Sequence, residues 1–575
     1  MLRRIFSYMK EYKKYAWLAL ICIGVEVVLE IMVPKLMADL IDIGVTNSDV
    51  PYIINKGIQM AVCAVAALIL GVGSARFSAL AGQGLGANIR KAEYEKLQSY
   101  SFSNIDHFSV SSLVIRLTSD VTNIQNAVST GMRPFGRSPV MLIFATTLAF
   151  QINSTLALVF LVALPVLAVL LIIIIINVGP RYGRMQGAVD LVNRCIEENL
   201  TAVRVVKSYV RGDYEIEKFG HVNDNLKNES EKAFGIAVLN MPAMQFVMYS
   251  TILGILLIGG RLINSGQMMI GQLTSFLSYV LLILNSLMMM SNVFLLMTRS
   301  LASAERIMKV IDEPIDITDE NAKDIEVKKG EIEFNHVWFK YNETAKEYVL
   351  SDVSFHINAG QTVGIIGQTG SSKTTLIQLI PRLYDASKGE IKIDGINVKE
   401  YPVRHLRDAI SVVLQKNTLF SGSLIDNLRW GDENATLDEI KEACSIACVD
   451  EFIDRLPGGL DAEMGQEGVN VSGGQKQRIC IARAILKKPK VLILDDSTSA
   501  VDTATEGKIK NALAKKLPDM TKIIIAQRIS SVCQADQIII MDGGRVDAIG
   551  THESLLRTNK IYQEIYESQK EGADL

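Results

Sequence analysis

Residues 367–375 read Gly-Gln-Thr-Gly-Ser-Ser-Lys-Thr-Thr, and this stretch decides how the second half of the chain folds. An apolar run suited to a buried strand, residues 362–366, precedes it, and a helical pattern begins at Leu376. A strand, a loop of small residues with a lysine, and a helix form the context of a phosphate-binding loop. We expect Lys373 to contact the β- and γ-phosphates of a nucleotide and Thr374 to bind Mg²⁺. The predicted nucleotide-binding residues of this loop are Gly367, Gln368, Thr369, Gly370, Ser371, Ser372, Lys373, Thr374 and Thr375.

One position of this loop departs from the usual pattern. Ser372 stands where a glycine ordinarily precedes the lysine, so it adds a side chain where the backbone must approach phosphate. The alternative interpretation of the stretch is a Ser/Gly turn with a solvated lysine. The motifs farther along the chain favour the phosphate-binding loop.

Length and composition limit how the chain is organised. With 575 residues it is too long for one domain, because a domain commonly holds ~150 residues. The net charge of −3 provides no basic field, so we expect no nucleic-acid partner. Long apolar runs occur only in the first half, which predicts a membrane domain there. The seven cysteines form neither a CxxC pair nor a secreted framework, as expected of packing residues in a reduced compartment.

The apolar runs predict six transmembrane helices, each requiring ~20 residues to cross a bilayer. The run 139–176 is about twice that length and is broken by polar residues within 151–154, so it predicts two helices. The N-terminus and the Arg- and Lys-rich segments 76–137 and 181–240 are cytoplasmic by the positive-inside rule. We therefore expect a multi-pass protein of a plasma membrane, with both termini and the second half in the cytoplasm. The predicted helices are about 15–37, 57–74, 138–152, 154–178, 241–263 and 271–297.

The two long cytoplasmic segments have mostly helical patterns. At ~1.5 Å per residue, helices of such length extend well below the bilayer. Residues 101–112 and 205–214 interrupt these patterns and are expected to form short helices that dock on a cytosolic ATPase. Ordinary cytoplasmic loops are the alternative, which the length and similarity of the two segments disfavour.

Two carboxylates, Glu26 and Glu30, lie in the first predicted span, four residues apart and therefore on one helix face. Ionisable groups inside a membrane are costly and mark a cavity or a partner. One interpretation is a water-filled cavity whose acidic groups favour cationic or amphipathic cargo. The other is a structural pair, bonded to Arg or Ser/Thr on a neighbouring helix or lying near the outer interface. The sequence leaves both open.

The chain changes character after the last apolar run. We expect residues 1–310 to form the transmembrane domain and the charged stretch 311–329 to be a linker. From residue 330 onward, short strand-like runs alternate with helical patterns. The region 330–575 is therefore predicted to be a cytosolic α/β ATPase domain built around the phosphate loop.

Three further residues complete the predicted nucleotide site. A buried strand ends at Asp495, the arrangement that fixes Mg²⁺ beside a phosphate loop. Gln415 follows the strand-like run 410–414 and is expected to reach both the metal and the transferred phosphate. Tyr341 lies upstream of the loop, where it can stack on adenine. A surface aromatic on a strand is the alternative for this tyrosine.

A second anion-binding pattern, Val-Ser-Gly-Gly-Gln, occupies residues 471–475 at the start of another helix. Two glycines and a serine at a helix N-terminus bind anions through the backbone N–H groups. One nucleotide site has no use for a second γ-phosphate cradle so far along the chain. The simplest explanation is that this signature serves a nucleotide held by another copy of the domain. Its residues are Ser472, Gly473, Gly474 and Gln475.

The order of these motifs resembles the nucleotide-binding domain of ATP-binding cassette (ABC) transporters. With six predicted spans ahead of that domain, the whole chain resembles an exporter-type half-transporter. The resemblance implies ATP and Mg²⁺ as cofactors, and two such domains paired head to tail, each ATP lying between one phosphate loop and the other's signature. ATP then closes the pair and turns the spans from inward-open to outward-open. Two further motifs carry the resemblance: Ser499-Ala500-Val501-Asp502, with Asp502 at the nucleotide interface, and Ala526-Gln527-Arg528.

Two positions depart from the pattern of this family. Asp496 stands where the family usually has the glutamate that polarises the attacking water, and Gln527 replaces the usual switch histidine. A carboxylate that is one methylene shorter falls short of the water by roughly 1 Å, which can cost about 10²-fold in rate. Loss of a positioned general base costs ~10²–10⁴ in rate. With Gln415, these are the candidate catalytic residues, and we expect the site to bind ATP and hydrolyse it poorly.

The signature 472–475 is intact, however, and it is useful only opposite a competent site, which this chain does not supply. The chain therefore resembles the degenerate-site subunit of heterodimeric bacterial multidrug exporters. We expect as partner a related half-transporter with Glu and His at the two altered positions, and as cargo an amphipathic small molecule. The alternatives are a working homodimer, a non-hydrolysing regulatory or gating subunit, and a lipid flippase or a metabolite or peptide exporter on the same architecture.

Overall fold

The computed structural model describes residues 2–320, 322–496 and 501–571. Contacts between residues divide the chain into two compact units. The first unit holds Met1–Gln98 and Val110–Glu313, and the second holds Ser99–Ser109 and Pro314–Leu575. The short segment Ser99–Ser109 lies inside the predicted transmembrane domain of residues 1–310, but it packs with the second unit.

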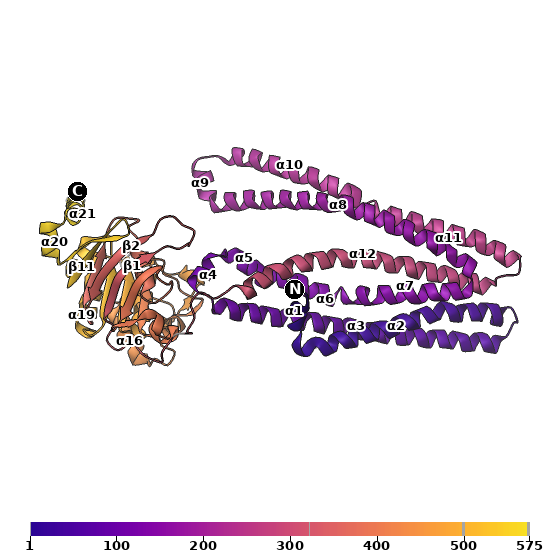
Figure 1. Cartoon of the computed structure of the whole chain (residues 1–575), viewed down its shortest axis with the longest axis horizontal. Coiled ribbons are helices and arrows are strands. Elements are labelled where there is room, and N and C mark those ends of the chain that lie inside the picture. Colours follow the sequence, from indigo (N-terminus) through magenta and orange to yellow (C-terminus); the bar gives the residue numbers. More distant parts are fainter. Residues whose placement is uncertain (1, 321, 497–500, 572–575) are drawn as a thin grey trace. The chain divides into compact units, whose positions relative to one another are not determined.

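The first unit is built from helices, several of them far longer than one membrane crossing (Figure 1). They are α1 (Leu2–Ser7), α2 (Lys13–Asp39), α3 (Val50–Gln98), α5 (Val110–Ile115), α6 (Val121–Ser129), α7 (Met132–Ile152), α8 (Ser154–Thr201), α9 (Val203–Ser208), α10 (Gly212–Ala237), α11 (Asn240–Asn264) and α12 (Ile270–Asp312), with the short turns η1 (Lys10–Tyr12), η2 (Leu40–Val45) and η3 (Arg116–Asp120). Helices α2 and α3 lie side by side, as do α8 and α10, while α12 packs along α7 and α2. Each predicted span falls within one helix, and α3, α8 and α12 continue far beyond their spans.

Length and composition agree with membrane crossing. In the described part of the chain, five helical stretches are long and apolar enough to span a bilayer. The predicted span 271–297 lies in α12, whose described apolar stretch is shorter and covers Ile270–Ser286. The five longer stretches are Lys10–Val45, Val50–Gln98, Val110–Ile152, Ser154–Thr201 and Gly212–Asn264.

Polar side chains of α12 bind the backbone of α2 near Pro34, which has no N–H to give its own helix. The Ser275 hydroxyl donates to the backbone oxygen of Pro34 at 2.7 Å, and the Tyr279 hydroxyl donates to that of Ile31 at 3.0 Å. Ser275 and Tyr279 are fully buried. These hydrogen bonds from side chains of α12 to backbone oxygens of α2 hold the two helices together.

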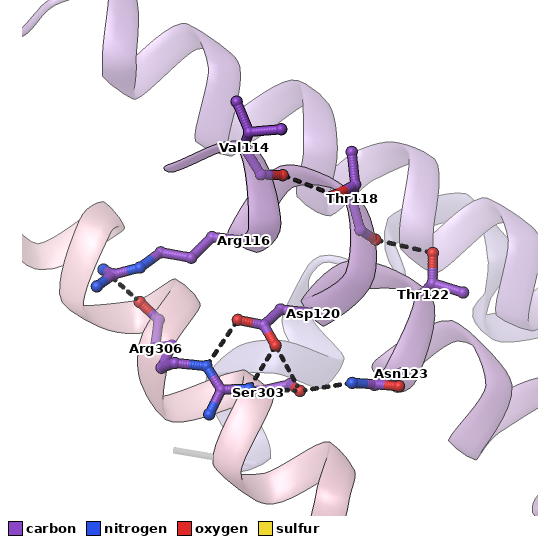
Figure 2. A network of polar contacts seen from close by, with 8 residues as sticks. All are labelled: Val114, Arg116, Thr118, Asp120, Thr122, Asn123, Ser303 and Arg306. Atoms are coloured by element: carbon purple, nitrogen blue, oxygen red, sulfur yellow. Dashed lines mark hydrogen bonds and ion pairs between the residues drawn. The ribbon is translucent and has the colours of Figure 1, made fainter. Parts of the chain in front are cut away.

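A buried carboxylate, Asp120, joins α12 to the π-helical turn η3 (Figure 2). It accepts hydrogen bonds from the Nε atom of Arg306 and from the Ser303 hydroxyl, both at 2.8 Å. Arg116 donates from Nη1 to the backbone oxygen of Arg306 at 3.1 Å. Because Asp120 is almost fully buried, its charge requires these partners, and the contact fixes α12 against η3.

The second unit combines two sheets with surrounding helices. One sheet has the order β2-β1-β4-β5 and the other β12-β11-β3-β10-β9-β6, with β7-β8 as a separate pair. The strands are β1 (Ile332–Phe339), β2 (Leu350–Ile357), β3 (Thr362–Ile366), β4 (Lys388–Ile393), β5 (Ile396–Asn397), β6 (Ile410–Val413), β7 (Gly422–Ser423), β8 (Glu463–Met464), β9 (Val491–Asp495), β10 (Thr521–Ile525), β11 (Gln537–Asp542) and β12 (Arg545–Gly550). The helices are α4 (Phe102–Asp106), α13 (Lys373–Leu379), α14 (Val403–Asp408), α15 (Leu424–Arg429), α16 (Leu437–Ile446), α17 (Asp450–Ile453), α18 (Gly473–Leu486), α19 (Thr503–Lys516), α20 (His552–Thr558) and α21 (Lys560–Glu571).

The larger sheet is a parallel α/β sheet with one antiparallel edge strand. Strands β11, β3, β10, β9 and β6 are parallel to their neighbours, and β12 is antiparallel to β11. Strands β9 and β10 are buried along their whole length, which explains the apolar runs 491–494 in β9 and 523–525 in β10. One hydrophobic core lies between the two sheets, and the other lies between the larger sheet and helices such as α16 and α18.

Candidate nucleotide-binding site

Four adjacent strands bring the predicted nucleotide-binding residues to one edge of the larger sheet. The phosphate loop follows β3, and Asp495 is the last residue of β9. Gln527 comes two residues after β10, and Gln415 two residues after β6. Because β3, β10, β9 and β6 are neighbours and parallel, their carboxyl ends meet, which is where α/β sheets bind ligands.

The phosphate loop closes around the ammonium group of Lys373, the first residue of α13. Its Nζ atom donates to the backbone oxygens of Gly367 and Gln368, both at 2.8 Å, and to the Ser371 hydroxyl at 3.1 Å. A Cβ atom at Gly367 would lie 2.1 Å from the backbone oxygen of Met541, so glycine is required there. Burial lowers the pKa of Lys373. The loop therefore holds a partly desolvated cation that phosphate oxygens can bind in place of the carbonyl groups.

Ser372 has a left-handed backbone conformation, with φ of 68°. A residue with a Cβ atom loses about 1–2 kcal/mol in this conformation, whereas the usual glycine loses none. Ser372 is also the N-cap of α13, and its side chain makes no capping hydrogen bond. The departure from the usual loop pattern is thus a strained position at the start of the phosphate-binding helix.

Thr374 and Asp495 form the part of the site suited to a divalent cation. The Thr374 hydroxyl donates to the Oδ1 atom of Asp495 at 3.3 Å. Asp495 is 2% exposed, and its Oδ2 atom has no hydrogen-bond partner among the described residues. Burial raises the pKa of this carboxyl. A buried carboxylate oxygen without a donor, beside a hydroxyl, fits Mg²⁺, which is bound by oxygen ligands.

The three candidate catalytic side chains meet at one atom. The Oδ2 atom of Asp496 accepts a hydrogen bond from the amide nitrogen of Gln527 at 3.0 Å and another from that of Gln415 at 3.5 Å. Burial raises the pKa of Asp496, and two neighbouring cationic side chains oppose that shift. Gln415, expected at the metal, therefore contacts Asp496 in this structure. Asp496 itself has φ of 46°, a second strained position beside the phosphate loop.

Tyr341 is attached to the phosphate-binding helix by its hydroxyl group. The hydroxyl lies 2.9 Å from the Thr375 hydroxyl and donates to the Oε1 atom of Gln378 at 3.3 Å. The ring packs edge-on against Phe339 and Tyr384, with centroids 4.9 and 5.2 Å away. With 47% of its surface exposed, the ring still presents area on which an adenine base can stack.

The signature residues cap the helix α18. The backbone nitrogen of Ser472 donates to the Oε1 atom of Gln475 at 2.9 Å, and the backbone nitrogen of Gln475 donates to the Ser472 hydroxyl at 3.3 Å. This reciprocal capping box leaves Gly473 and Gly474, the first residues of α18, in the first turn of the helix. Their backbone N–H groups belong to the helix N-terminus and are suited to bind an anion.

Asp502 caps α19 and accepts a hydrogen bond from the backbone nitrogen of Thr505 at 2.9 Å. That backbone bond lowers the pKa of the Asp502 carboxyl. The preceding members of its motif, Ser499 and Ala500, lie outside the described residues. The structure thus gives Asp502 a structural contact, and its place at the nucleotide interface stays a prediction.

A contact that the sequence did not indicate joins α4 to the site. The Tyr384 hydroxyl donates to the Oδ2 atom of Asp106 at 2.7 Å, and the Tyr384 ring lies 6.0 Å from that of Phe102. The same ring touches Tyr341. Residues 101–112 were predicted to contain a short docking helix, and α4, capped by Ser101, is that helix. Its partner Tyr384 follows the phosphate-binding helix without any motif that marks it.

The two carboxylates of the first span are both paired with arginines of α7. Glu26 Oε1 accepts hydrogen bonds from Arg133 Nη2 at 2.6 Å and Arg137 Nη1 at 3.3 Å. Arg137 Nη2 lies 2.5 Å from Glu30 Oε2. Glu26 and Glu30 also line an open cavity, so the structure contains elements of both interpretations. The matching i, i+4 spacing of Arg133 and Arg137 is the sequence signal that identifies these partners.

Comparison with known proteins agrees with this geometry. Residues 16–287 match the family model of the ABC transporter transmembrane region, and residues 350–499 match the family model described as ABC transporter. An uncharacterised ABC transporter ATP-binding protein of Bacillus subtilis, YfiB, is 37% identical over 575 residues, covering 100% of both chains. The ATP-dependent lipid A-core flippase of Pseudomonas putida is 32% identical, covering 98% of this chain and 95% of the flippase.

A solved structure has the same fold. The bacterial Atm1-family ABC exporter with ATP bound superposes with a TM-score of 0.84 over 97% of this chain and 99% of that one, at 22% identity. The predicted fold class, an exporter-type helical membrane domain fused to an α/β P-loop ATPase, is confirmed. The chain belongs to the ABC transporter family.

Proposed function

We propose that this chain is one half of a heterodimeric ABC exporter whose own nucleotide site binds ATP and Mg²⁺ but hydrolyses ATP slowly. Lys373 and the loop backbone would hold the phosphates, and Thr374 and Asp495 would hold the metal, which neutralises phosphate charge when bound. The observation that carries the proposal is the pairing of Asp496 with Gln527, 3.0 Å apart. In the usual pattern of the family that this chain resembles, a glutamate stands at the position of Asp496 and a histidine at that of Gln527.

The contacts of Asp496 explain slow hydrolysis in physical terms. Its carboxylate is shorter than that of glutamate by one methylene, and its Oδ2 atom already accepts bonds from two amides, those of Gln527 and Gln415. The two amide donors occupy the carboxylate oxygen that would otherwise accept a proton from the attacking water. Gln527 carries no charge that could stabilise the transferred phosphate. Together these effects correspond to losses of about 10²–10⁴ in rate.

The intact signature supports a partner that supplies the competent site. Ser472 and Gln475 form a complete capping box, so the N-terminus of α18 is ordered without any nucleotide contact from its own chain. An anion-binding helix N-terminus of this kind can complete a nucleotide site on a second, related half-transporter. We infer a partner with glutamate and histidine at the two altered positions.

The cargo is proposed to be an amphipathic small molecule, such as a drug, exported across the plasma membrane of a bacterium. The long apolar helices and the open cavity of the first unit support this. The name of the Pseudomonas relative, a lipid A-core flippase, favours a lipid as a second candidate cargo. No nucleic-acid partner is proposed, in keeping with the net charge of −3.

The test is transport by the complex. The chain is co-purified with its membrane partner, and ATP-driven uptake of fluorescent amphiphiles is measured in inverted vesicles. We expect uptake that stops when the partner's catalytic glutamate is replaced. ATP binding without vectorial uptake would instead identify a gating or regulatory subunit, and brisk transport by this chain alone would identify a working homodimer.

A further inference from the structure

The cavity of the first unit is lined mostly by apolar side chains, together with three charged ones and the polar residues Ser278 and Asn285. Its volume is about 750 Å³, within the range of sites for drug-sized ligands. Helices α2, α3 and α12 supply the walls, with side chains such as Val33, Leu68, Val72 and Leu281. The lining residues that carry charge are Glu26, Glu30 and Arg133.

The charged groups of the cavity and their partners have no net charge, but they are not equally accessible. Two carboxylates and two guanidinium groups, those of Arg133 and Arg137, form one connected cluster. The Glu26 side chain is 5% exposed and accepts two guanidinium hydrogen bonds, whereas the Arg133 side chain is 44% exposed. The most accessible charge of the cluster is therefore positive, and the most buried one is negative.

A glycine allows this arrangement. A Cβ atom at Gly71 would lie 3.2 Å from the Oε1 atom of Glu26 and 3.3 Å from the Nη2 atom of Arg133. Both distances are tighter than ordinary packing, so a side chain at this position of α3 would require the ion pair to shift by a few tenths of an ångström. The absence of a side chain at Gly71 thus leaves room for the pair of Arg133 and Glu26 beside α3.

We propose that this cavity binds an amphiphile with an anionic headgroup, held by Arg133, while its apolar body lies along α3 and α12. The proposal rests on the exporter function proposed above and names the class of its cargo. A cation would have to compete with a guanidinium group at either carboxylate, because Arg133 and Arg137 hold Glu26 and Arg137 holds Glu30. A guanidinium group that lost its partner there would be left uncompensated in an apolar setting. An anion needs no such exchange, because it adds to the exposed side of a guanidinium that offers five donors.

Equilibrium binding to the detergent-purified protein, without ATP, tests this. The probes are a fluorescent dodecyl phosphate, the trimethylammonium compound with the same tail, and glycerol phosphate, which lacks the tail. We expect the tailed phosphate to bind at least tenfold more tightly than either of the others. Arg133→Gln should weaken it about tenfold or more, the loss of one charge-assisted hydrogen bond, and Arg133→Lys should restore part of the affinity. Arg194→Gln, at an exposed position of α8, is the matched control and should change nothing.

A second variant should change the affinity for the tailed phosphate in the opposite direction, and its result does not depend on whether Arg133→Gln folds. Glu30→Gln leaves Arg137 less neutralised, so the tailed phosphate should bind severalfold more tightly. Three results would overturn the proposal. The trimethylammonium probe could bind more tightly than the tailed phosphate, the tailed phosphate could lose affinity in Glu30→Gln, or glycerol phosphate could bind as tightly as the tailed phosphate. Failure of the exporter function is separate: it would appear as unchanged probe binding with no ATP-driven uptake, whereas ATP-driven uptake of the cationic probe alone would contradict only the cargo class.

Discussion

The amide nitrogen of Gln527 lies 3.0 Å from the Oδ2 atom of Asp496, and the amide of Gln415 lies 3.5 Å from the same atom. One carboxylate oxygen of Asp496 thus accepts hydrogen bonds from both Gln527 and Gln415, the two side chains expected beside the γ-phosphate. A carboxylate oxygen occupied in this way is less available to orient the attacking water, and the amide of Gln527 carries no charge. The proposed asymmetry of the transporter follows from this single contact.

The first prediction concerns the complex with its partner. Asp496→Ala should leave steady-state ATP hydrolysis within about twofold, because the proposed function assigns little of the turnover to this site. Replacing the catalytic glutamate of the partner should reduce hydrolysis by ~10² or more. Phosphate release by the purified complex measures both. Equal losses from the two substitutions would mean that the two sites work alike.

The second prediction compares the phosphate loop with the signature of this chain. Gly473→Asp places a negative charge at the N-terminus of α18. It should stop most turnover if that helix faces the phosphates of the partner's site, as proposed. Lys373→Ala should weaken ATP binding at the degenerate site and slow transport only in part. Nucleotide affinity and ATP hydrolysis are measured for each variant. Turnover that survives Gly473→Asp would show that this signature does not serve the working site.

The third prediction concerns the contact between α4 and the site. Tyr384→Phe removes the bond of 2.7 Å to Asp106 but keeps the ring against Tyr341. Hydrogen bonds to charged groups contribute about 1.5–3 kcal/mol, so α4 should be held more weakly. We expect transport per ATP hydrolysed to fall while nucleotide affinity changes less than twofold. Tyr348→Phe, in which the altered ring packs on Trp338, is the control and should have no effect.

The fourth prediction concerns pH and Glu93, which lies on α3 beyond the predicted span 57–74. Its side chain is fully buried, and neither carboxylate oxygen has a hydrogen-bond partner among the described residues. Burial raises the pKa of Glu93 to about 7, with Arg116 lowering it and Asp120 raising it to a smaller extent. The packed protein therefore keeps a proton on Glu93 at pH values where an exposed glutamate has lost it.

The sign of the resulting pH dependence follows from linkage. Unfolding releases this proton between the ordinary pKa of 4.5 and about 7, so stability is greatest below that window and falls as the pH rises through it. Glu93→Gln should remove this decrease, raising Tm relative to the unaltered protein at pH 8 but not at pH 4. Glu95→Gln, whose side chain is 66% exposed, is the control. A Tm difference that does not depend on pH would contradict the prediction.

Much of the fold was predictable because local chemistry determines it. The loop 367–375 can only follow a strand and open a helix, and buried strands such as β9 contain an apolar run. The helix boundaries of the first unit were less predictable, since α3 continues to Gln98 through residues that are no longer apolar. Membrane periodicity marks only the part of a helix that lipid surrounds.

The site was predictable where a motif exists and not where packing decides. Asp495, Thr374 and Lys373 meet as their spacing predicts, because adjacent parallel strands end together. The contact between Asp106 and Tyr384 joins residues far apart in sequence that no motif marks. The hydrogen bond from Gln415 to Asp496 depends on side-chain rotation, which the spacing of residues along the chain does not determine.

The most direct test of the central claim is ATP turnover by this chain alone, reconstituted in lipid without a companion subunit. The double variant Asp496→Glu with Gln527→His is measured beside it as the reference. We predict that both bind ATP and that the unaltered chain hydrolyses it at least ~10²-fold more slowly than the double variant. Hydrolysis within a few-fold of the double variant, accompanied by transport, would contradict the account of a degenerate site.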